Sequence, residues 1–402
     1  MTAGTRRRPV ARPAGGLFRS FFLAGFECST HVNRLGRRLD LITATGHDRY
    51  ARADYARLGE LGIRTARDGI RWHLVERTPG RYDFSCVLPL VRAARETGTQ
   101  VIWDLCHYGW PDDLDVFGPE FVSRFAAYAG AVAAFLSAED DDPPLLAPMN
   151  EISYLTWAGG HVGSMSPFAR ERGMELKRQL VRATIAGVRA IRAVNRRARL
   201  FHIDPMCNVV ADPGRPEDRP AAEAYRLAQY EAWDMISGRL HPELGGAEAY
   251  LDVVGVNYYP DNQWLWAGNV APATTIDRTH PLYRPVWQML REVYERYRRP
   301  LFIAETGTED ERRSQWLRYI GREVRTAQAA GVPIEGICLY PILNHPGWED
   351  DRHCHNGLWD YADESGRRPI YAPLAQELRR QQRLFTRQGA GHHPTGVAEL
   401  DG

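Results

Sequence analysis

The chain has almost no net charge, a single lysine and few cysteines. Its 402 residues include 51 basic and 50 acidic side chains, which give a formal net charge of +1. This balance provides no excess of positive charge that would indicate binding to nucleic acid or to an anionic membrane surface. Lys177 is the one lysine, a bias to which we assign no function. The six cysteines lack Cys-x-x-Cys spacing, which is typical of buried free thiols in a reducing compartment.

Long apolar runs are also missing. The apolar stretch 17–26 is interrupted by Arg19 and followed at once by Glu27, so we expect neither a signal-peptide core nor a membrane-spanning helix. We therefore expect a cytoplasmic protein with a basic, proline-rich and disordered arm over residues 1–16, one folded domain over 17–388 and a flexible tail over 389–402.

What the chain does contain is a regular alternation of short apolar runs and longer amphipathic ones. The short runs predict strands at 22–28, 65–69, 101–106, 145–149, 200–204, 253–257, 301–304 and 337–340. The longer runs predict helices at 48–61, 87–97, 120–136, 170–194, 221–237, 286–297, 311–330 and 374–384. Eight strand-helix units predict a (β/α)8 TIM barrel built as a single domain.

A doubly wound parallel sheet is the alternative fold for this alternation. It ranks below the barrel because no glycine-rich phosphate-binding turn follows any early strand. In a barrel the active site is built where the strands end, by the loops that follow them.

Two of the predicted strands run directly into a glutamate. The segments are Leu146-Ala-Pro-Met-Asn-Glu151 and Pro300-Leu-Phe-Ile-Ala-Glu305. A lone glutamate is usually a surface charge, but two that meet at one end of a barrel could act as the carboxylate pair that cleaves glycosidic bonds. Other polar or aromatic side chains follow strand ends too: Arg67, His107, Asn150, Asn257, Tyr259 and Trp348.

Five ordered segments carry a resemblance to a known family. They are Arg67-x-x-Ile70-x-Trp72, Leu105-x-His107-x-x-x-Pro111, Asn150-Glu151, Val254-Gly-Val-Asn-Tyr-Tyr259 and Ile303-Ala-Glu-Thr-Gly307. In this order the chain resembles the family 1 glycoside hydrolases, the retaining β-glucosidase-like barrels, from Phe21 to about Tyr371.

The resemblance implies roles for individual residues. Glu151 would be the general acid and base, and Glu305 the nucleophile, with Arg67 and Tyr259 keeping Glu305 ionised. Glu151 lacks a cation and should titrate higher. Asn150 would donate to the sugar 2-hydroxyl, and His107 would contact another hydroxyl. Asn257 and the aromatic residues Tyr108, Tyr340 and Trp348 complete the predicted sugar site, although each aromatic could instead be barrel packing.

The sugar-binding pattern of the family is only partly present. A glutamine after the first strand and a Phe-Glu-Trp segment after the last are both missing, and Gly347 stands where that glutamate should be. Glu27, His31 and Glu349 are the candidates to replace them. Catalysis therefore looks preserved while sugar specificity looks altered.

We predict a retaining β-glycosidase that acts on a small glycoside without metal or organic cofactor, nucleic acid or membrane. Two alternatives stay open: a transglycosidase that uses the same glycosyl-enzyme, with an acceptor pocket near residues 264–266, and a sugar-binding barrel without turnover. The loop 350–355 holds metal-capable residue types but lacks the two-pair spacing of structural zinc sites. The sequence does not predict the sugar, the aglycone or the oligomeric state.

Overall fold

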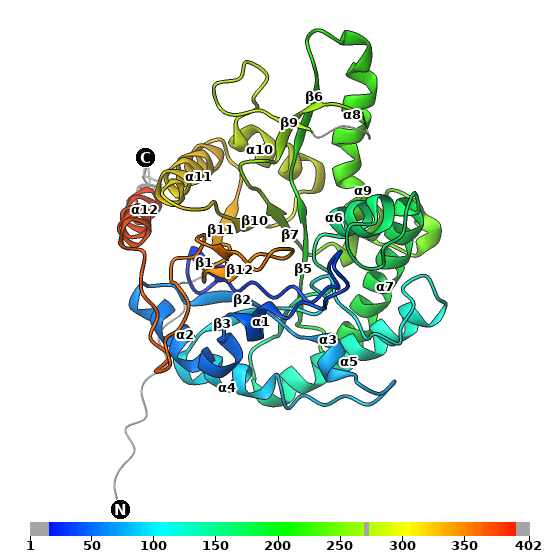
Figure 1. Ribbon diagram of the computed structural model, residues 1–402, viewed down its shortest axis with the longest axis vertical. Helices are drawn as coiled ribbons and strands as arrows, with labels where there is room; N and C mark the ends of the chain where they lie inside the picture. The colour runs from blue at the N-terminus through cyan, green and yellow to red at the C-terminus, as the bar shows by residue number, and fades with distance from the viewer. Residues whose placement is uncertain (1–15, 269–272, 391–402) are drawn as a thin grey trace, which may run out of the picture.

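The computed structural model describes residues 16–268 and 273–390. Eight parallel strands close into a barrel, and all eight predicted strands are present. They are β1 (Phe22–Gly25), β2 (Thr65–Gly69), β3 (Gln100–Asp104), β4 (Leu145–Ala147), β5 (Arg199–Pro205), β7 (Val253–Asn257), β10 (Leu301–Thr306) and β11 (Ile334–Leu339). β1 closes the ring by pairing with both β2 and β11. The single-domain (β/α)8 barrel is therefore confirmed (Figure 1).

Helices surround the ring of strands (Figure 1). The main ones are α2 (His47–Glu60), α4 (Leu88–Thr97), α5 (Glu120–Glu139), α7 (Gly173–Val194), α10 (Val286–Tyr297), α11 (Arg312–Ala329) and α12 (Ala372–Ala390). Short helices occur at α1 (Leu41–Ala44), α3 (Trp72–Val75) and α6 (Ile152–Leu155), with a π-helical turn at Thr156–Val162. In α7 the residues Leu176, Leu180 and Ile191 are fully buried, as the helical spacing of its apolar residues predicts.

One predicted helix is wrong in its continuity. Residues 221–237 form α8 (Arg219–Leu227), a 3-10 turn (Ala228–Tyr230) and α9 (Glu231–Ile236). The turn lies where the Gln229 side chain hydrogen bonds both backbone groups of Cys207, its Oε1 accepting from the amide at 2.9 Å and its Nε2 donating to the carbonyl at 3.1 Å. This contact to the loop after β5 coincides with the break in the helix.

Helix α5 is the one helix of the described residues that is long and apolar enough to cross a membrane, with a mean hydropathy of 1.4. It packs instead as a helix of the barrel. Phe121, Phe125 and Tyr128 are buried around the ring of Trp72, and the Tyr128 hydroxyl donates to the carbonyl of Leu105 at 3.0 Å. Its apolar character is therefore accounted for by core packing.

The barrel interior holds its own apolar cluster, separate from the layer between strands and helices. It includes Leu23, Ile102, Ala147, Phe201 and Phe302, because successive side chains of a strand point to opposite faces. Phe18 adds to this cluster, with its ring 5.1 Å from that of Phe302. Polar side chains lie at the carboxyl ends of the strands.

Two small sheets were not predicted. One combines β6 (Asn208–Ala211), β8 (Gln263–Trp266) and β9 (Thr274–Thr275), and Figure 1 shows β6 and β9 beside α8 beyond the ring. Tyr225 of α8 contacts the rings of Trp264 and Trp266 in this sheet. These two tryptophans belong to the segment near which the transglycosidase alternative places its acceptor pocket. The other pairs β12 (His345–Pro346) with β13 (His353–Cys354) in the loop after β11.

At the end of the described residues, α12 reaches Ala390 and so includes the first two residues of the expected tail. The rest of the tail, and the expected arm apart from Gly16, lie outside the described residues.

Candidate active site

The two glutamates singled out by the sequence come together at the carboxyl end of the barrel. Glu305 belongs to β10, and Glu151 follows β4; they are 5% and 8% exposed. Glu305 lies opposite Asn257 of β7 in the sheet, and the Asn257 amide Nδ2 donates to Glu151 Oε1 at 2.8 Å. Asn257 therefore lies beside both glutamates, bonding the Glu151 carboxylate and pairing with Glu305 through the sheet.

Glu305 has two hydrogen-bond donors. Arg67 Nη1 donates to its Oε1 at 2.6 Å, and the Tyr259 hydroxyl donates to its Oε2 at 2.8 Å. Arg67 and Tyr259 are the two residues that the sequence analysis assigned to this carboxylate. Because Arg67 is fully buried, its charge is not screened by water and acts strongly on Glu305.

The remaining donors of Arg67 hold other parts of the site. Nε and Nη2 bind the two oxygens of Asp104 at 3.0 and 2.6 Å, Nη2 also binds Asn150 Oδ1 at 2.6 Å, and Nη1 reaches the Ala304 carbonyl at 3.4 Å. A guanidinium has five N–H donors, so each one of Arg67 has an acceptor. The sequence analysis missed Asp104, although it ends an apolar strand as the two glutamates do.

Glu151 has a different environment. The Tyr108 hydroxyl donates to its Oε2, Asn257 donates to its Oε1, and no ion pair within the described residues includes it. Burial and the charge of Glu305 raise the pKa of Glu151 to about 8, while these two hydrogen bonds partly oppose the increase. Near neutral pH Glu151 is therefore mostly protonated, whereas Glu305 faces a guanidinium. The pKa of Glu151 is thus raised, as the sequence analysis expects for a carboxyl group without a neighbouring cation.

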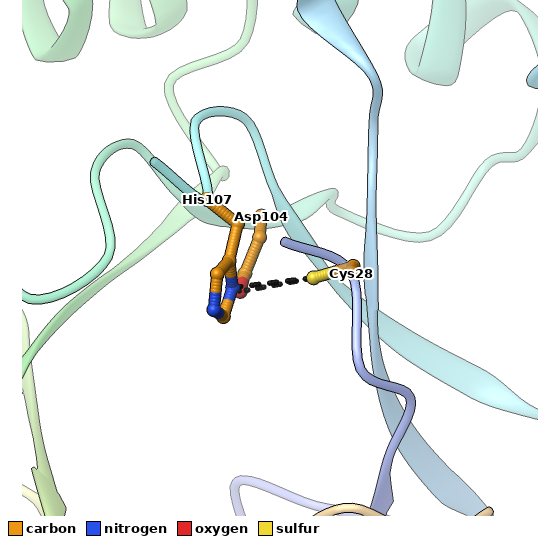
Figure 2. Close-up of side chains that lie close together, drawn as sticks. All are labelled: Cys28, Asp104 and His107. Carbon is orange, nitrogen blue, oxygen red and sulfur yellow. Dashed lines mark hydrogen bonds and ion pairs between the residues drawn. The ribbon is translucent and has the colours of Figure 1, made fainter. Parts of the chain in front are cut away.

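His107 is fixed by contacts on both ring nitrogens. Nδ1 lies 2.9 Å from Asp104 Oδ2 and 3.2 Å from Cys28 Sγ (Figure 2), and Nε2 lies 3.1 Å from Asn150 Nδ2. With the Nδ1 proton directed at Asp104, Nε2 accepts from Asn150. Both ring nitrogens of His107 thus have protein partners, so its predicted contact with a sugar hydroxyl would have to replace one of these bonds, whereas Asn150 Nδ2 has a second N–H that could donate to a sugar.

Cys28, Asp104 and His107 offer three potential metal-ligand atoms within 4.8 Å of one another. Figure 2 shows the three side chains pointing toward one another. However, both Asp104 oxygens already accept hydrogen bonds from Arg67, and burial raises the pKa of Cys28 well above its usual value, so that it is a thiol. Since metals bind the thiolate, these contacts favour a hydrogen-bonded cluster that orients His107.

A second group of potential ligands lies in the loop after β11. His353, His355 and Asp360 have ligand atoms within 4.8 Å of one another, and Asp360 is the member that the sequence analysis did not include. Asp360 Oδ1 already accepts from the Asn344 side chain at 3.0 Å and pairs with His353 Nε2 at 2.7 Å. Asp360 therefore already has two side-chain partners in the loop.

Aromatic side chains surround the two glutamates. The ring of Tyr108 lies 5.9 Å from that of Trp348, and the guanidinium of Arg67 lies 5.4 Å from the Tyr340 ring. Tyr340 also belongs to the apolar cluster of the barrel interior, beside Gly25, where an added Cβ would come within 2.0 Å of its ring. Its position is therefore determined at least in part by packing.

The three candidates for the missing sugar-binding residues differ in their surroundings. Glu27 is 6% exposed and accepts from the Ser29 amide at 3.0 Å. His31 is 1% exposed, and neither ring nitrogen has a hydrogen-bond partner among the described residues. The Glu349 side chain is 31% exposed and pairs with Arg34 at 3.2 Å. Glu27 and His31 are thus the buried candidates, while Glu349 lies at the rim.

No protein-family model matches the chain, and no curated protein matches its sequence. Solved structures are similar to it. The family 1 β-glucosidase from Thermotoga maritima superposes with a TM-score of 0.73 at 17% identity, covering 91% of this chain and 97% of that chain. The β-glucosidase of that organism in complex with castanospermine gives the same values. Its complex with methyl acetic acid-substituted glucoimidazole gives 0.72 at 16% identity, covering 92% and 98%. The chain therefore has the fold of the family 1 β-glucosidases, and at this level the resemblance seen in the sequence is confirmed.

Proposed function

We propose that the protein is a retaining β-glycosidase that hydrolyses a small β-glycoside by double displacement. The observation that carries the proposal is the contrast between two buried glutamates at the carboxyl end of the barrel: Glu305 accepts from a guanidinium, whereas Glu151 has no cation in contact among the described residues, and burial together with the charge of Glu305 raises its pKa to about 8. A pair of carboxyl groups with separated pKa values is what this chemistry requires, because one must attack as an anion while the other donates a proton.

In the first step a carboxylate oxygen of Glu305 bonds to the anomeric carbon. The bond from that carbon to the leaving oxygen breaks, and this oxygen takes the proton of Glu151. In the second step Glu151, now an anion, removes a proton from water. The resulting hydroxide oxygen attacks the anomeric carbon, the ester bond breaks, and both carboxyl groups return to their starting states. Two inversions give net retention.

The neighbours of the two glutamates support this cycle. Arg67 and Tyr259 hold the Glu305 carboxylate in place and stabilise its charge before attack and after release. Asn257 and Tyr108 donate to Glu151, so they stabilise the anion that forms once its proton has left. Asn257 Oδ1 has no partner among the described residues, which leaves an acceptor for a substrate hydroxyl.

The sugar specificity of this site is proposed to differ from that of ordinary β-glucosidases. The basis is the pair Glu27 and His31 after β1, which occupies the part of the barrel mouth where the family pattern has a glutamine.

A 2-deoxy-2-fluoro β-glycoside with an activated leaving group tests the proposal, offered alongside a panel of nitrophenyl β-glycosides. We expect a stable adduct on the peptide that contains Glu305, detected by mass spectrometry, together with burst release of the leaving group. Glu305→Gln should prevent the adduct. Glu309→Gln is the matched control, since that carboxylate is held by Arg352 outside the site at 2.6 and 2.7 Å. Sugar binding without turnover or adduct would instead identify a sugar-binding barrel.

A further inference from the structure

Glu27 is a buried carboxylate that no cation of the protein neutralises by direct contact. It is 6% exposed, the Ser29 amide donates to its Oε1 at 3.0 Å, and no ion pair within residues 16–268 and 273–390 includes it. Burial raises its pKa, but the neighbouring imidazoles of His107 and His345 and the bonds from Ser29 have the larger combined effect and lower the pKa overall. Glu27 is therefore an anion at neutral pH.

The carboxylate of Glu27 lies near enough to the proposed catalytic residues for its charge to act on their neighbours. Burial is the main cause that raises the pKa of Tyr259, which donates to Glu305, and that of Tyr340, which lies over Arg67, and the charge of Glu27 adds to both increases. Arg67 cannot balance Glu27, because all of its donors are directed at Asp104, Glu305, Asn150 and the Ala304 carbonyl. Glu27 is thus a third buried carboxylate beside Asp104 and Glu305, and it has no guanidinium in contact with it among the described residues.

His31 lies on the same side of the mouth and needs a partner as well. Its ring packs edge-on against Trp348, at 4.7 Å, and against Tyr108, at 6.0 Å. Burial lowers its pKa to about 4, so the ring is neutral and offers one N–H donor and one acceptor nitrogen. Both ring nitrogens are buried and unpartnered among the described residues, a state that costs free energy unless a ligand or water binds them.

We infer that the mouth is built for a cationic amino sugar, whose ammonium group binds Glu27 while a neighbouring hydroxyl binds His31. This inference rests on the proposed glycosidase function and specifies its substrate class. An ammonium group supplies a cation and donors together. A hydroxyl would donate to Glu27 without bringing a cation into contact with it. A ligand that leaves a buried charge without such a partner loses much of its binding free energy.

Equilibrium binding tests this inference without requiring turnover. We would measure by calorimetry the Kd values of pairs of methyl β-D-glucosides that differ by an amino group in place of the hydroxyl at C2, C3, C4 or C6. At about pH 6 such amines are protonated. For one position we expect the amino glycoside to bind about 10- to 100-fold more tightly than the neutral one, the range typical of a charge-assisted bond. The N-acetylated ligand, which keeps the nitrogen and loses the charge, should lose this advantage.

Variants assign the preference to Glu27. Glu27→Gln keeps the side-chain shape and should bring the amino and neutral ligands to within about 3-fold of each other, whereas Glu309→Gln should keep the wild-type ratio. Equal affinity for every pair of ligands in the wild-type protein, or a preference that survives in Glu27→Gln, would overturn the inference. These outcomes are independent of the Glu305 adduct: an adduct without amine preference refutes only the substrate class, and amine preference without an adduct refutes only the hydrolytic function.

Discussion

Replacing Tyr108 with phenylalanine should move the pKa of Glu151 in a direction that the structure determines. The Tyr108 hydroxyl donates to Glu151 Oε2, and this bond opposes the effects of burial and of the Glu305 charge, which raise the pKa of Glu151 to about 8. Without the hydroxyl the anion of Glu151 loses a donor, while the protonated form loses a weaker interaction. The pKa of Glu151 should therefore rise further in Tyr108→Phe.

The size of the shift follows from the difference between two hydrogen bonds. A bond to a charged group contributes roughly 1.5–3 kcal/mol and a neutral one roughly 0.5–1.5 kcal/mol, so the anion loses about 1–1.5 kcal/mol more than the acid. Since one pKa unit corresponds to about 1.4 kcal/mol, the shift should be about one unit. Because the first step needs protonated Glu151, the alkaline limb of kcat/KM should move upward by that amount.

The assay is the pH dependence of kcat/KM for a nitrophenyl β-glycoside hydrolysed by the wild type and by Tyr108→Phe. Tyr154→Phe is the matched control: its ring lies 5.7 Å from that of Tyr108, but its hydroxyl does not donate to Glu151. We expect the control to keep the wild-type alkaline limb. An alkaline limb that stays in place or moves to lower pH in Tyr108→Phe would refute the assignment of that limb to a Glu151 held by this bond.

Two further predictions concern stability. Arg67→Met leaves Asp104 and Glu305 buried without their guanidinium, and should lower the free energy of unfolding by about 3–5 kcal/mol in urea denaturation; a loss under about 1 kcal/mol would contradict the buried charge pairing. His47 lies 2.9 Å from both Asp54 and Asp68, and although burial lowers its pKa, these carboxylates raise it from 6.5 to about 9. Its folded pKa exceeds the unfolded one, so its contribution is complete below about pH 6.5 and is lost as pH rises through about 9. The difference in Tm between wild type and His47→Gln should shrink over that interval, and a constant or growing difference would contradict this.

The barrel is predictable from the sequence because each strand is a short apolar run that ends in turn or polar residues. Glu151 and Glu305 are found in the same way, since parallel strands deliver their carboxyl ends to one edge. Asp104 also lies at the carboxyl end of its strand. His107 and Tyr108 follow shortly after it, and the sequence analysis selected these two residues instead. The break near Gln229 coincides with a contact to Cys207, 22 residues earlier in the chain, and no local pattern reveals it.

The side-chain contacts of the site are harder to predict, because spacing along the chain does not determine which donor meets which acceptor. The sequence suggests that His107 faces a sugar, whereas the structure has its two ring nitrogens bound to Asp104 and Asn150. It likewise treats Glu27, His31 and Glu349 as equal candidates. Burial and pairing distinguish the three residues. Glu349 pairs with Arg34, whereas Glu27 and His31 have no such partner among the described residues.

The bonds of Arg67 also connect three strands and one loop, because they link its own strand β2 to β3, to β10 and to the loop after β4. One side chain therefore contributes both to holding the proposed nucleophile and to linking strands of the barrel. A descendant of this protein without hydrolytic activity is consequently expected to change Glu151 first and to retain Arg67. Such an inactive homologue would still have Arg67 bound to its carboxylate partners.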